Sequence, residues 1–278
     1  MKINSVQCLY FSPTGSTQKI VETISVGTGK PVKTSINITT PKQRDKFDGQ
    51  VDGDLLIVGV PVYTGKYPSI IQSSLSKIDG SRLYALPISV CGNVRMGTCL
   101  ADLCGLLKKQ GFTIPAAGNF IAQHSFACEN FPIGKGRPDE GDLDKARDFG
   151  QHVVDKIAKD PEDITSLYRG NLYIRMYVSG SMEAEGFTSL GERHSPFIRV
   201  SEHNDELCQE CGSCVEVCPT GAIDARSYRI NDDLCIRCFA CTNVCPNGVK
   251  EKVVRPNEEL SAWFRHRAKE RGEPLLFF

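Results

Sequence analysis

Two cysteine runs decide how the later part of this chain folds. They read Cys208-Gln-Glu-Cys211-Gly-Ser-Cys214-Val-Glu-Val-Cys218-Pro219 and Cys235-Ile-Arg-Cys238-Phe-Ala-Cys241-Thr-Asn-Val-Cys245-Pro246. Each run has three closely spaced cysteines, then a fourth one slightly further on, then a proline. Because the second run repeats the spacing of the first, the pattern indicates a doubled metal site.

The spacing predicts two 4Fe-4S clusters that share their ligands between the runs. Three thiolates on a tight loop can reach three irons of one cubane, whereas the fourth cysteine of such a run ligates the other cluster. One predicted ligand set is Cys208, Cys211, Cys214 and Cys245. The other predicted set is Cys235, Cys238, Cys241 and Cys218.

This stretch also resembles a known family. Residues Cys208 to Val249 are similar to a bacterial two-cluster ferredoxin, and Cys218-Pro219-Thr220-Gly221-Ala222-Ile223 matches the end of that family's first cysteine run. Several apolar residues lie between the ligands and are expected to exclude water from the clusters. These residues are Val215, Val217, Ile223, Ile236, Phe239, Val244 and Val249.

Zinc and disulfides are the alternatives for the cysteines. Paired CxxC spacings also build tetrahedral zinc sites, but zinc knuckles usually stop at two cysteines, so the four-cysteine runs favour iron-sulfur clusters. The sequence begins Met1-Lys2-Ile3-Asn4-Ser5 and shows no long apolar run ahead of a cleavage site. Without such a signal, the 13 cysteines favour metal over a disulfide framework.

Composition limits the other classes of function. The chain has 278 residues, of which 40% are hydrophobic, so it can bury a core and has room for about two domains. Lysine plus arginine equals aspartate plus glutamate at 33 each, which gives no overall attraction to nucleic acid or anionic lipid. No apolar stretch approaches the roughly 18 residues of a membrane span. We expect a soluble, cytoplasmic protein, and oxygen-labile clusters would suit an anaerobic cell.

The amino-terminal part begins with an anion-binding pattern. The apolar run Val6 to Phe11 predicts a buried strand, and a helical pattern follows after Ser12-Pro13-Thr14-Gly15-Ser16-Thr17. Gly15 permits a tight turn, and the helix start adds free amides and a partial positive charge. The hydroxyl groups that could bind phosphate oxygens belong to Ser12, Thr14, Ser16 and Thr17.

The type of phosphate follows from what this loop lacks. It has neither the GxxxxGK[ST] pattern of a nucleoside triphosphate loop nor the GxGxxG pattern of a dinucleotide loop. Hydroxyls and amides suit a single terminal phosphate monoester, and the loop resembles the FMN phosphate loop of flavodoxin. An ordinary serine or threonine helix cap is the alternative.

Two later loops are expected to complete an FMN site. The strand Leu55 to Val60 leads into Pro61-Val62-Tyr63-Thr64-Gly65, and the strand Leu83 to Val90 leads into Cys91-Gly92-Asn93-Val94-Arg95. Loops that follow parallel strands gather at one edge of the sheet, where ligands bind. We expect Tyr63 to stack on a flavin ring, Gly92 and Asn93 to face its pyrimidine edge, and Arg95 to favour a reduced anionic flavin. Surface packing is the alternative for Tyr63.

The rest of this part completes a fold prediction. A last strand over Phe112 to Phe120 and a helix over Asp142 to Ile157 make five strands alternating with helices, which predicts a doubly wound parallel α/β sheet. The resemblance to flavodoxin implies the strand order 2-1-3-4-5, with the second strand near Pro31 to Ile38. In the long connecting loop, His124 is predicted to be a solvated or hydrogen-bonded residue, with an approach to the flavin as the alternative. Four cysteines without metal spacing are expected to be small buried residues, namely Cys8, Cys99, Cys104 and Cys128.

The expected boundaries are as follows. Residues 1–160 form the flavodoxin-like domain, 161–200 a linker that packs on the domains, 201–255 an α+β two-cluster ferredoxin domain, and 256–278 a helix and tail. The apolar stripe of Glu258 to Arg271 predicts that the tail docks back onto the protein; a basic docking surface is the alternative.

Over nearly its whole length the chain resembles flavodoxin-ferredoxin fusion proteins. The resemblance implies an electron carrier with FMN and two 4Fe-4S clusters, no catalytic residue, and redox proteins as partners; a homodimer stays open. In the fusions the third flavin loop carries Gly-Asn-Arg and a tyrosine, whereas here Arg95 is displaced and the aromatic residue is missing. The rival hypothesis is an FMN-dependent reductase of a quinone, enone or oxygen species, with His124, Tyr63 or Cys91 as proton donor.

Overall fold

The computed structural model of the chain describes residues 3–81, 83–94, 96–159, 163–164, 198–201 and 204–278. Arg95 lies outside the described residues. So does most of the segment 161–200 that was predicted to be a linker.

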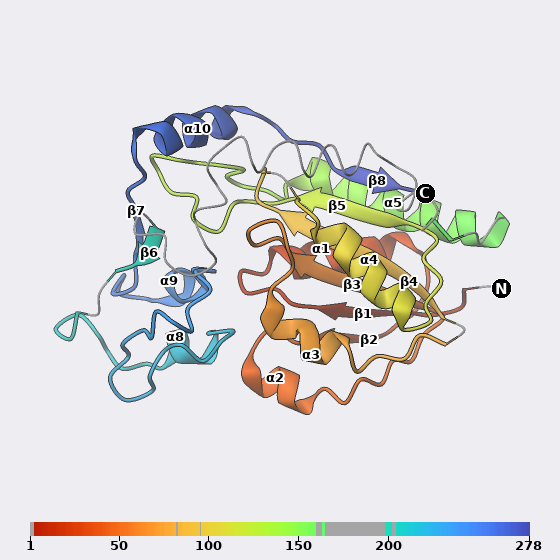
Figure 1. Cartoon of the computed structure of the whole chain (residues 1–278), viewed down its shortest axis with the longest axis horizontal. Coiled ribbons are helices and arrows are strands. Elements are labelled where there is room, and N and C mark those ends of the chain that lie inside the picture. Colours follow the sequence, from red (N-terminus) through yellow and green to blue (C-terminus); the bar gives the residue numbers. More distant parts are fainter. Residues whose placement is uncertain (1–2, 82, 95, 160–162, 165–197, 202–203) are drawn as a thin grey trace.

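A parallel sheet forms the centre of the larger domain (Figure 1). Its strands are β1 (Val6–Tyr10), β2 (Val32–Asn37), β3 (Leu55–Pro61), β4 (Tyr84–Cys91) and β5 (Ala117–Ile121). They lie in the order β2-β1-β3-β4-β5 and pair in parallel, which is the flavodoxin-type order expected from the sequence. The apolar runs in β1, β3, β4 and β5 are buried because helices cover both faces.

Helices α1 (Ser16–Gly27) and α5 (Glu140–Lys159) cover one face of the sheet. They approach closely: a Cβ added to Gly150 would lie 2.2 Å from the carbonyl oxygen of Ile24. Helix α4 (Cys99–Lys109) and the short helices η1 (Ser69–Ile71) and α3 (Gln72–Leu75) cover the other face. Helix α2 (Pro41–Lys46) follows β2.

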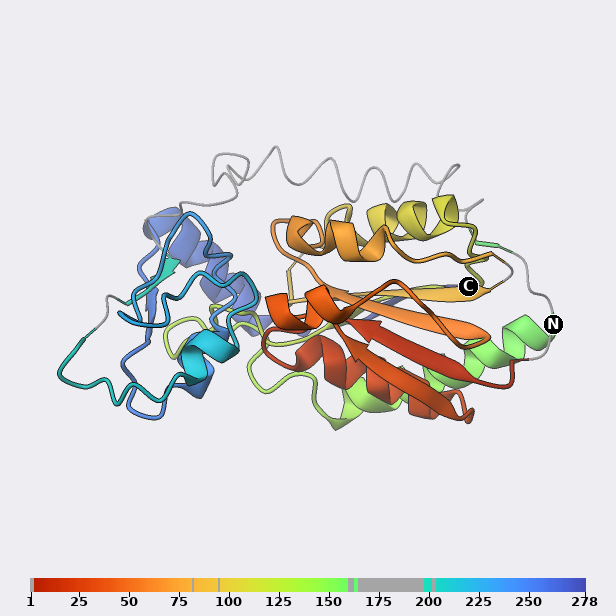
Figure 2. The ribbon, with the colours of Figure 1, turned by 90° about the horizontal axis from the view of Figure 1, so that it is seen from below.

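The smaller domain lies beside the carboxyl ends of the parallel strands (Figures 1 and 2). It contains β6 (Ile198–Val200), α8 (Ser213–Glu216), α9 (Ala240–Val244), β7 (Lys252–Val254) and α10 (Glu258–Lys269). Strands β6 and β7 pair antiparallel. Its core also takes in Phe131 and Ile133, which belong to the long loop after β5. That loop therefore contributes to the hydrophobic core of the smaller domain.

The tail docks back onto the protein, as expected, in a form that the sequence did not predict. Phe264 of α10 is fully buried in the core of the smaller domain. The chain then returns to the large sheet, where β8 (Leu275–Phe277) pairs antiparallel with β5. Phe278 packs edge-on against Phe149, with 5.3 Å between ring centroids. The last residues are thus a sixth strand of the first domain.

Among the described residues, no helix combines the length and the apolar character needed to cross a bilayer.

Candidate redox centres at the carboxyl edge of the sheet

Four cysteines surround a hollow at the far end of the smaller domain. They are Cys208, Cys211, Cys214 and Cys245, here called the outer set. The hollow has about 360 Å³ of empty volume, part of it open solvent, and Tyr228 and Lys250 line it as well. Cys211 is exposed, and the other three cysteines are half-buried.

The other four cysteines surround a second hollow. They are Cys218, Cys235, Cys238 and Cys241, here called the inner set. The empty volume is about 320 Å³, and the remaining lining is mostly apolar. The two sets have the membership predicted from the sequence, including the exchange of Cys218 and Cys245 between the runs.

Both hollows suit a cluster better than a single ion. Among the residues that the structure describes, no group of three His, Cys, Asp or Glu side chains converges closely enough for one metal ion. Zinc in a structural site needs four donors within about 2.3 Å of one point. Four thiols spread around a hollow match the donor set of a 4Fe-4S cubane.

Burial distinguishes the thiols of the two sets. In the inner set, burial raises the pKa of Cys241 to about 12 and raises the pKa of Cys238 still further. In the outer set, hydrogen bonds from Ser213 lower the pKa of exposed Cys211. The thiols of Cys238 and Cys241 are therefore neutral without metal, and insertion of a cluster must displace their protons.

A buried cation lies beside the outer set. Lys250 is 2% exposed, and its Nζ donates a hydrogen bond to the carbonyl of Tyr228 at 2.7 Å. The positive charge of Lys250 favours the thiolate of Cys214, although burial outweighs it and the pKa of Cys214 is raised. Sequence analysis missed this residue, because a single lysine beside a cysteine run is typical of an ordinary surface charge.

The predicted phosphate loop joins β1 to α1. Gly15 has φ +86° and faces open space, with no atom within 4 Å of an added Cβ. The Ser12 hydroxyl accepts a hydrogen bond from the amide of Gln18 at 3.0 Å, which turns the loop over the helix start. Within the described part of the chain, the amides of Ser16 and Thr17 have no hydrogen-bond partner. This arrangement fits a phosphate monoester.

The loop after β3 makes a tight turn beside the loop after β4. The backbone groups of Tyr63 and Lys66 bond each other at 2.8 and 3.0 Å, across Thr64 and Gly65, which both have positive φ. A Cβ added to Gly97 would lie 2.3 Å from the Cα of Gly65. The structure therefore brings the second and third predicted flavin loops together. Pro61 and Val62 are half-buried at the start of this loop.

The loop after β4 differs from the expectation in one respect. Gly92 and Val94 lie at the carboxyl end of the sheet as expected, but the side-chain amide of Asn93 bonds Arg267, Glu270 and Gly272 of the tail. In this structure the tail occupies the side-chain amide that was expected to face a flavin ring, and the backbone of Asn93 is what the loop offers for that role.

Cys91 is buried at 2% exposure, and its thiol donates to the carbonyl of Val94 at 3.1 Å. Burial raises its pKa.

His124 lies against the third predicted flavin loop. A Cβ on Gly92 would come within 2.7 Å of its ring, and the ring also packs on Phe126 with centroids 3.7 Å apart. Its Nδ1 is buried and has no hydrogen-bond partner among the described residues. Burial, helped by the charge of Lys252, lowers the pKa of His124 to about 3. His124, expected to be solvated or hydrogen-bonded, is instead a neutral packed ring whose Nδ1 lacks a partner among the described residues.

The inner set lies near the second predicted flavin loop. Ile236, between Cys235 and Cys238, packs on the sheet-domain core that also contacts Val62 and Tyr63. Burial, together with the nearby Cys238, raises the pKa of Tyr63 well above its usual value. Tyr63, expected to stack on a flavin, therefore lies within electrostatic reach of an inner cysteine.

Family models match both cysteine runs. Residues 202–224 match a model described as a 4Fe-4S binding domain, and residues 235–249 match a second model of the same description. The chain carries two 4Fe-4S binding motifs. A comparison with curated proteins found no match.

Solved structures similar to the first domain include several flavodoxins. One from the domain Archaea has 14% identity and a TM-score of 0.40, covering 55% of this chain and 99% of its own. A Streptococcus pneumonia TIGR4 flavodoxin has 15% identity and a TM-score of 0.40, with coverage of 55% and 99%. The rubredoxin oxygen:oxidoreductase of Desulfovibrio gigas has 18% identity and a TM-score of 0.43, with coverage of 56% and 37%.

Proposed function

We propose that this chain is an electron-transfer protein that holds FMN on the three loops at the carboxyl edge of its sheet and one 4Fe-4S cluster in each cysteine set. The flavodoxin-like sheet and the two 4Fe-4S binding motifs support a redox role. When bound, FMN would exchange one or two electrons and each cluster one.

The proximity of the inner set to the second flavin loop carries this proposal. Ile236 packs on the core beside Tyr63, and Cys238 acts on the pKa of Tyr63. Redox groups held by the inner set and by this loop would therefore be bound beside the same apolar core. The more exposed outer set would face a redox partner protein.

The chain's own residues would hold the flavin by its phosphate. The free amides of Ser16 and Thr17 and the hydroxyl of Thr14 are available to the phosphate oxygens at the positive end of α1. The backbone of residues 61–65 and 91–94 would border the ring. Arg95, which was expected to act on the ring's charge, lies outside the described residues.

The rival reductase needs a proton donor near the flavin, and the three candidates are poorly suited to that task. His124 is neutral because its pKa is lowered to about 3. The thiol proton of Cys91 already bonds the carbonyl of Val94, and burial raises the pKa of Tyr63. An effective general acid has a pKa near the working pH. The geometry thus favours a carrier over a reductase.

An anaerobic reductive titration tests the function. We expect about four electron equivalents per chain, two for FMN and one for each cluster. Thr14→Val, which removes the loop hydroxyl that is available to the phosphate, should weaken flavin binding and reduce the flavin's two equivalents while keeping both clusters, whereas Thr23→Val, half-buried further along the same helix, should keep all four. Saturable turnover of a quinone, an enone or oxygen would instead support the reductase.

A further inference from the structure

The side chain of Asn93 joins the third flavin loop to the tail. Its Nδ2 donates to the carbonyls of Arg267 at 3.1 Å and Glu270 at 2.7 Å, and its Oδ1 accepts from the amide of Gly272 at 2.8 Å. Asn93 is 5% exposed and has φ +59°, a conformation that asparagine tolerates better than most residues. Both the nitrogen and the oxygen of this amide are therefore bonded to the tail segment 267–272.

The contact is too close for another residue at position 272. A Cβ added to Gly272 would lie 2.5 Å from Oδ1 of Asn93. The backbone of the tail at Gly272 thus lies directly against the side chain of Asn93, with no room for a side chain between them.

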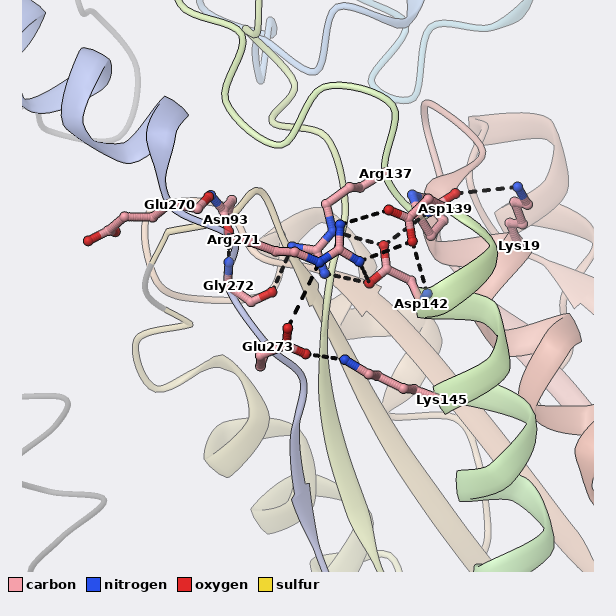
Figure 3. Close-up of polar contacts among 11 residues, drawn as sticks. Lys19, Asn93, Arg137, Asp139, Asp142, Lys145, Glu270, Arg271, Gly272 and Glu273 are labelled. Atoms are coloured by element: carbon pink, nitrogen blue, oxygen red, sulfur yellow. Dashed lines mark hydrogen bonds and ion pairs between the residues drawn. The ribbon is translucent and has the colours of Figure 1, made fainter.

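Charged residues anchor the same tail segment to the start of α5 (Figure 3). The guanidinium of Arg137, which is held by Asp142, donates to the carbonyl of Gly272 at 2.7 Å. Arg271 makes two hydrogen bonds to Asp139, at 2.8 and 3.1 Å. Arg137 and Asp142 are buried, so this part of the network is well shielded from water.

The tail segment also connects the two domains. Before it, α10 places Phe264 in the core of the smaller domain, next to Phe126 and Phe131. After it, β8 completes the large sheet beside β5. The tail segment that bonds Asn93 is therefore held in place by both domains. The conformation of the loop at Asn93 depends on that segment.

We propose that Asn93 is a positioning residue that couples flavin binding to docking of the segment 258–278. Flavin held by the loop 91–94 stabilises the loop conformation that receives the tail, and the docked tail stabilises the loop that receives flavin. Because binding linkage is reciprocal, each event strengthens the other by the same factor. This inference rests on the proposed FMN site.

The test uses the full chain with its clusters reconstituted without oxygen. FMN dissociation constants are measured by flavin fluorescence, and hydrogen exchange of residues 258–277 is measured with and without FMN. Asn93→Gly removes the side chain yet suits a positive φ. A chain ending at Pro274 removes β8 at a distance from the loop. Asn130→Gly, in an exposed turn, is the matched control.

We expect Asn93→Gly and the shortened chain to bind FMN about tenfold more weakly, as expected for the loss of one or two net hydrogen bonds, and the control to bind like wild type. FMN should slow exchange in residues 258–277 of the wild type and have a smaller effect in Asn93→Gly. If the wild type bound FMN and both variants bound it with the same dissociation constant as the wild type, the coupling would be overturned and the proposed function would stand. Failure of the wild type to bind FMN would overturn the proposed function and the coupling with it.

Discussion

Arg44 donates a hydrogen bond from its guanidinium to the carbonyl of Pro219 at 2.7 Å. Pro219 directly follows Cys218 of the inner set, while Arg44 also bonds the carbonyl of Thr39, whose hydroxyl accepts from the amide of Ser12. A continuous series of hydrogen bonds thus links the phosphate loop to the inner set.

The charge of Arg44 should raise the reduction potential of the inner cluster. Burial lowers the pKa of Arg44, but a guanidinium stays charged at neutral pH. Arg44→Gln removes a positive charge that favours the added electron, so we expect the inner midpoint potential to fall by tens of millivolts. Redox titration followed by EPR measures it. Lys42→Gln removes the same charge from the exposed side of α2, and an equal shift there would contradict a specific role for Arg44.

The exchange of ligands between the cysteine runs predicts which cysteine variants disable the same cluster. Cys218→Ala should disable the same cluster as Cys238→Ala, although Cys218 belongs to the first run. Cys245→Ala should likewise group with Cys208→Ala. Each variant is expected to retain about four irons, and the potential of the surviving cluster identifies the group. If Cys218→Ala grouped with Cys208→Ala, the crossed arrangement would be wrong.

Arg137 and Asp142 form a buried ion pair, with side-chain exposures of 5% and 1%. Asp142→Asn leaves the buried guanidinium without its counter-charge, so the free energy of unfolding should fall by about 3–5 kcal/mol. Denaturant titration measures the loss. Asp144→Asn, which removes an exposed carboxylate from the same helix, should cost about 1 kcal/mol or less. Equal losses in the two variants would contradict the importance of burial.

His124 should make stability depend on pH. In the unfolded chain it titrates near 6.5, but in the folded chain burial lowers its pKa to about 3. Between these values the unfolded chain binds a proton that the folded chain does not, so stability falls as the pH decreases below 6.5, by at most about 1.4 kcal/mol per unit. His124→Phe keeps a ring beside Phe126 and should flatten the dependence of Tm between about pH 6.5 and 5. Parallel curves for variant and wild type would exclude this role.

Much of this architecture follows from local sequence signals. The cysteine spacing predicted both sets, and the apolar runs predicted the buried strands, because these signals depend on neighbouring residues alone. The other parallel strands begin and end within one residue of the predicted bounds, but β5 begins at Ala117, whereas the apolar pattern began at Phe112.

The contacts that join the domains could not be predicted in the same way. Leu275–Phe277 is a short strand whose partner lies far away in sequence, and it looked like an apolar tail end. Asn93 looked like a ligand residue because its loop follows a strand, and nothing nearby in sequence revealed the tail that binds its amide. Arg44 gave no signal, since its partner Pro219 is distant along the chain.

The most direct test of the central claim is a count of iron, acid-labile sulfide and flavin per chain in protein isolated without oxygen. Two cubanes with four thiolates each and one phosphate loop predict about eight irons, eight sulfides and one FMN. Zinc in place of iron, together with an absence of flavin, would contradict the account of an electron-transfer protein.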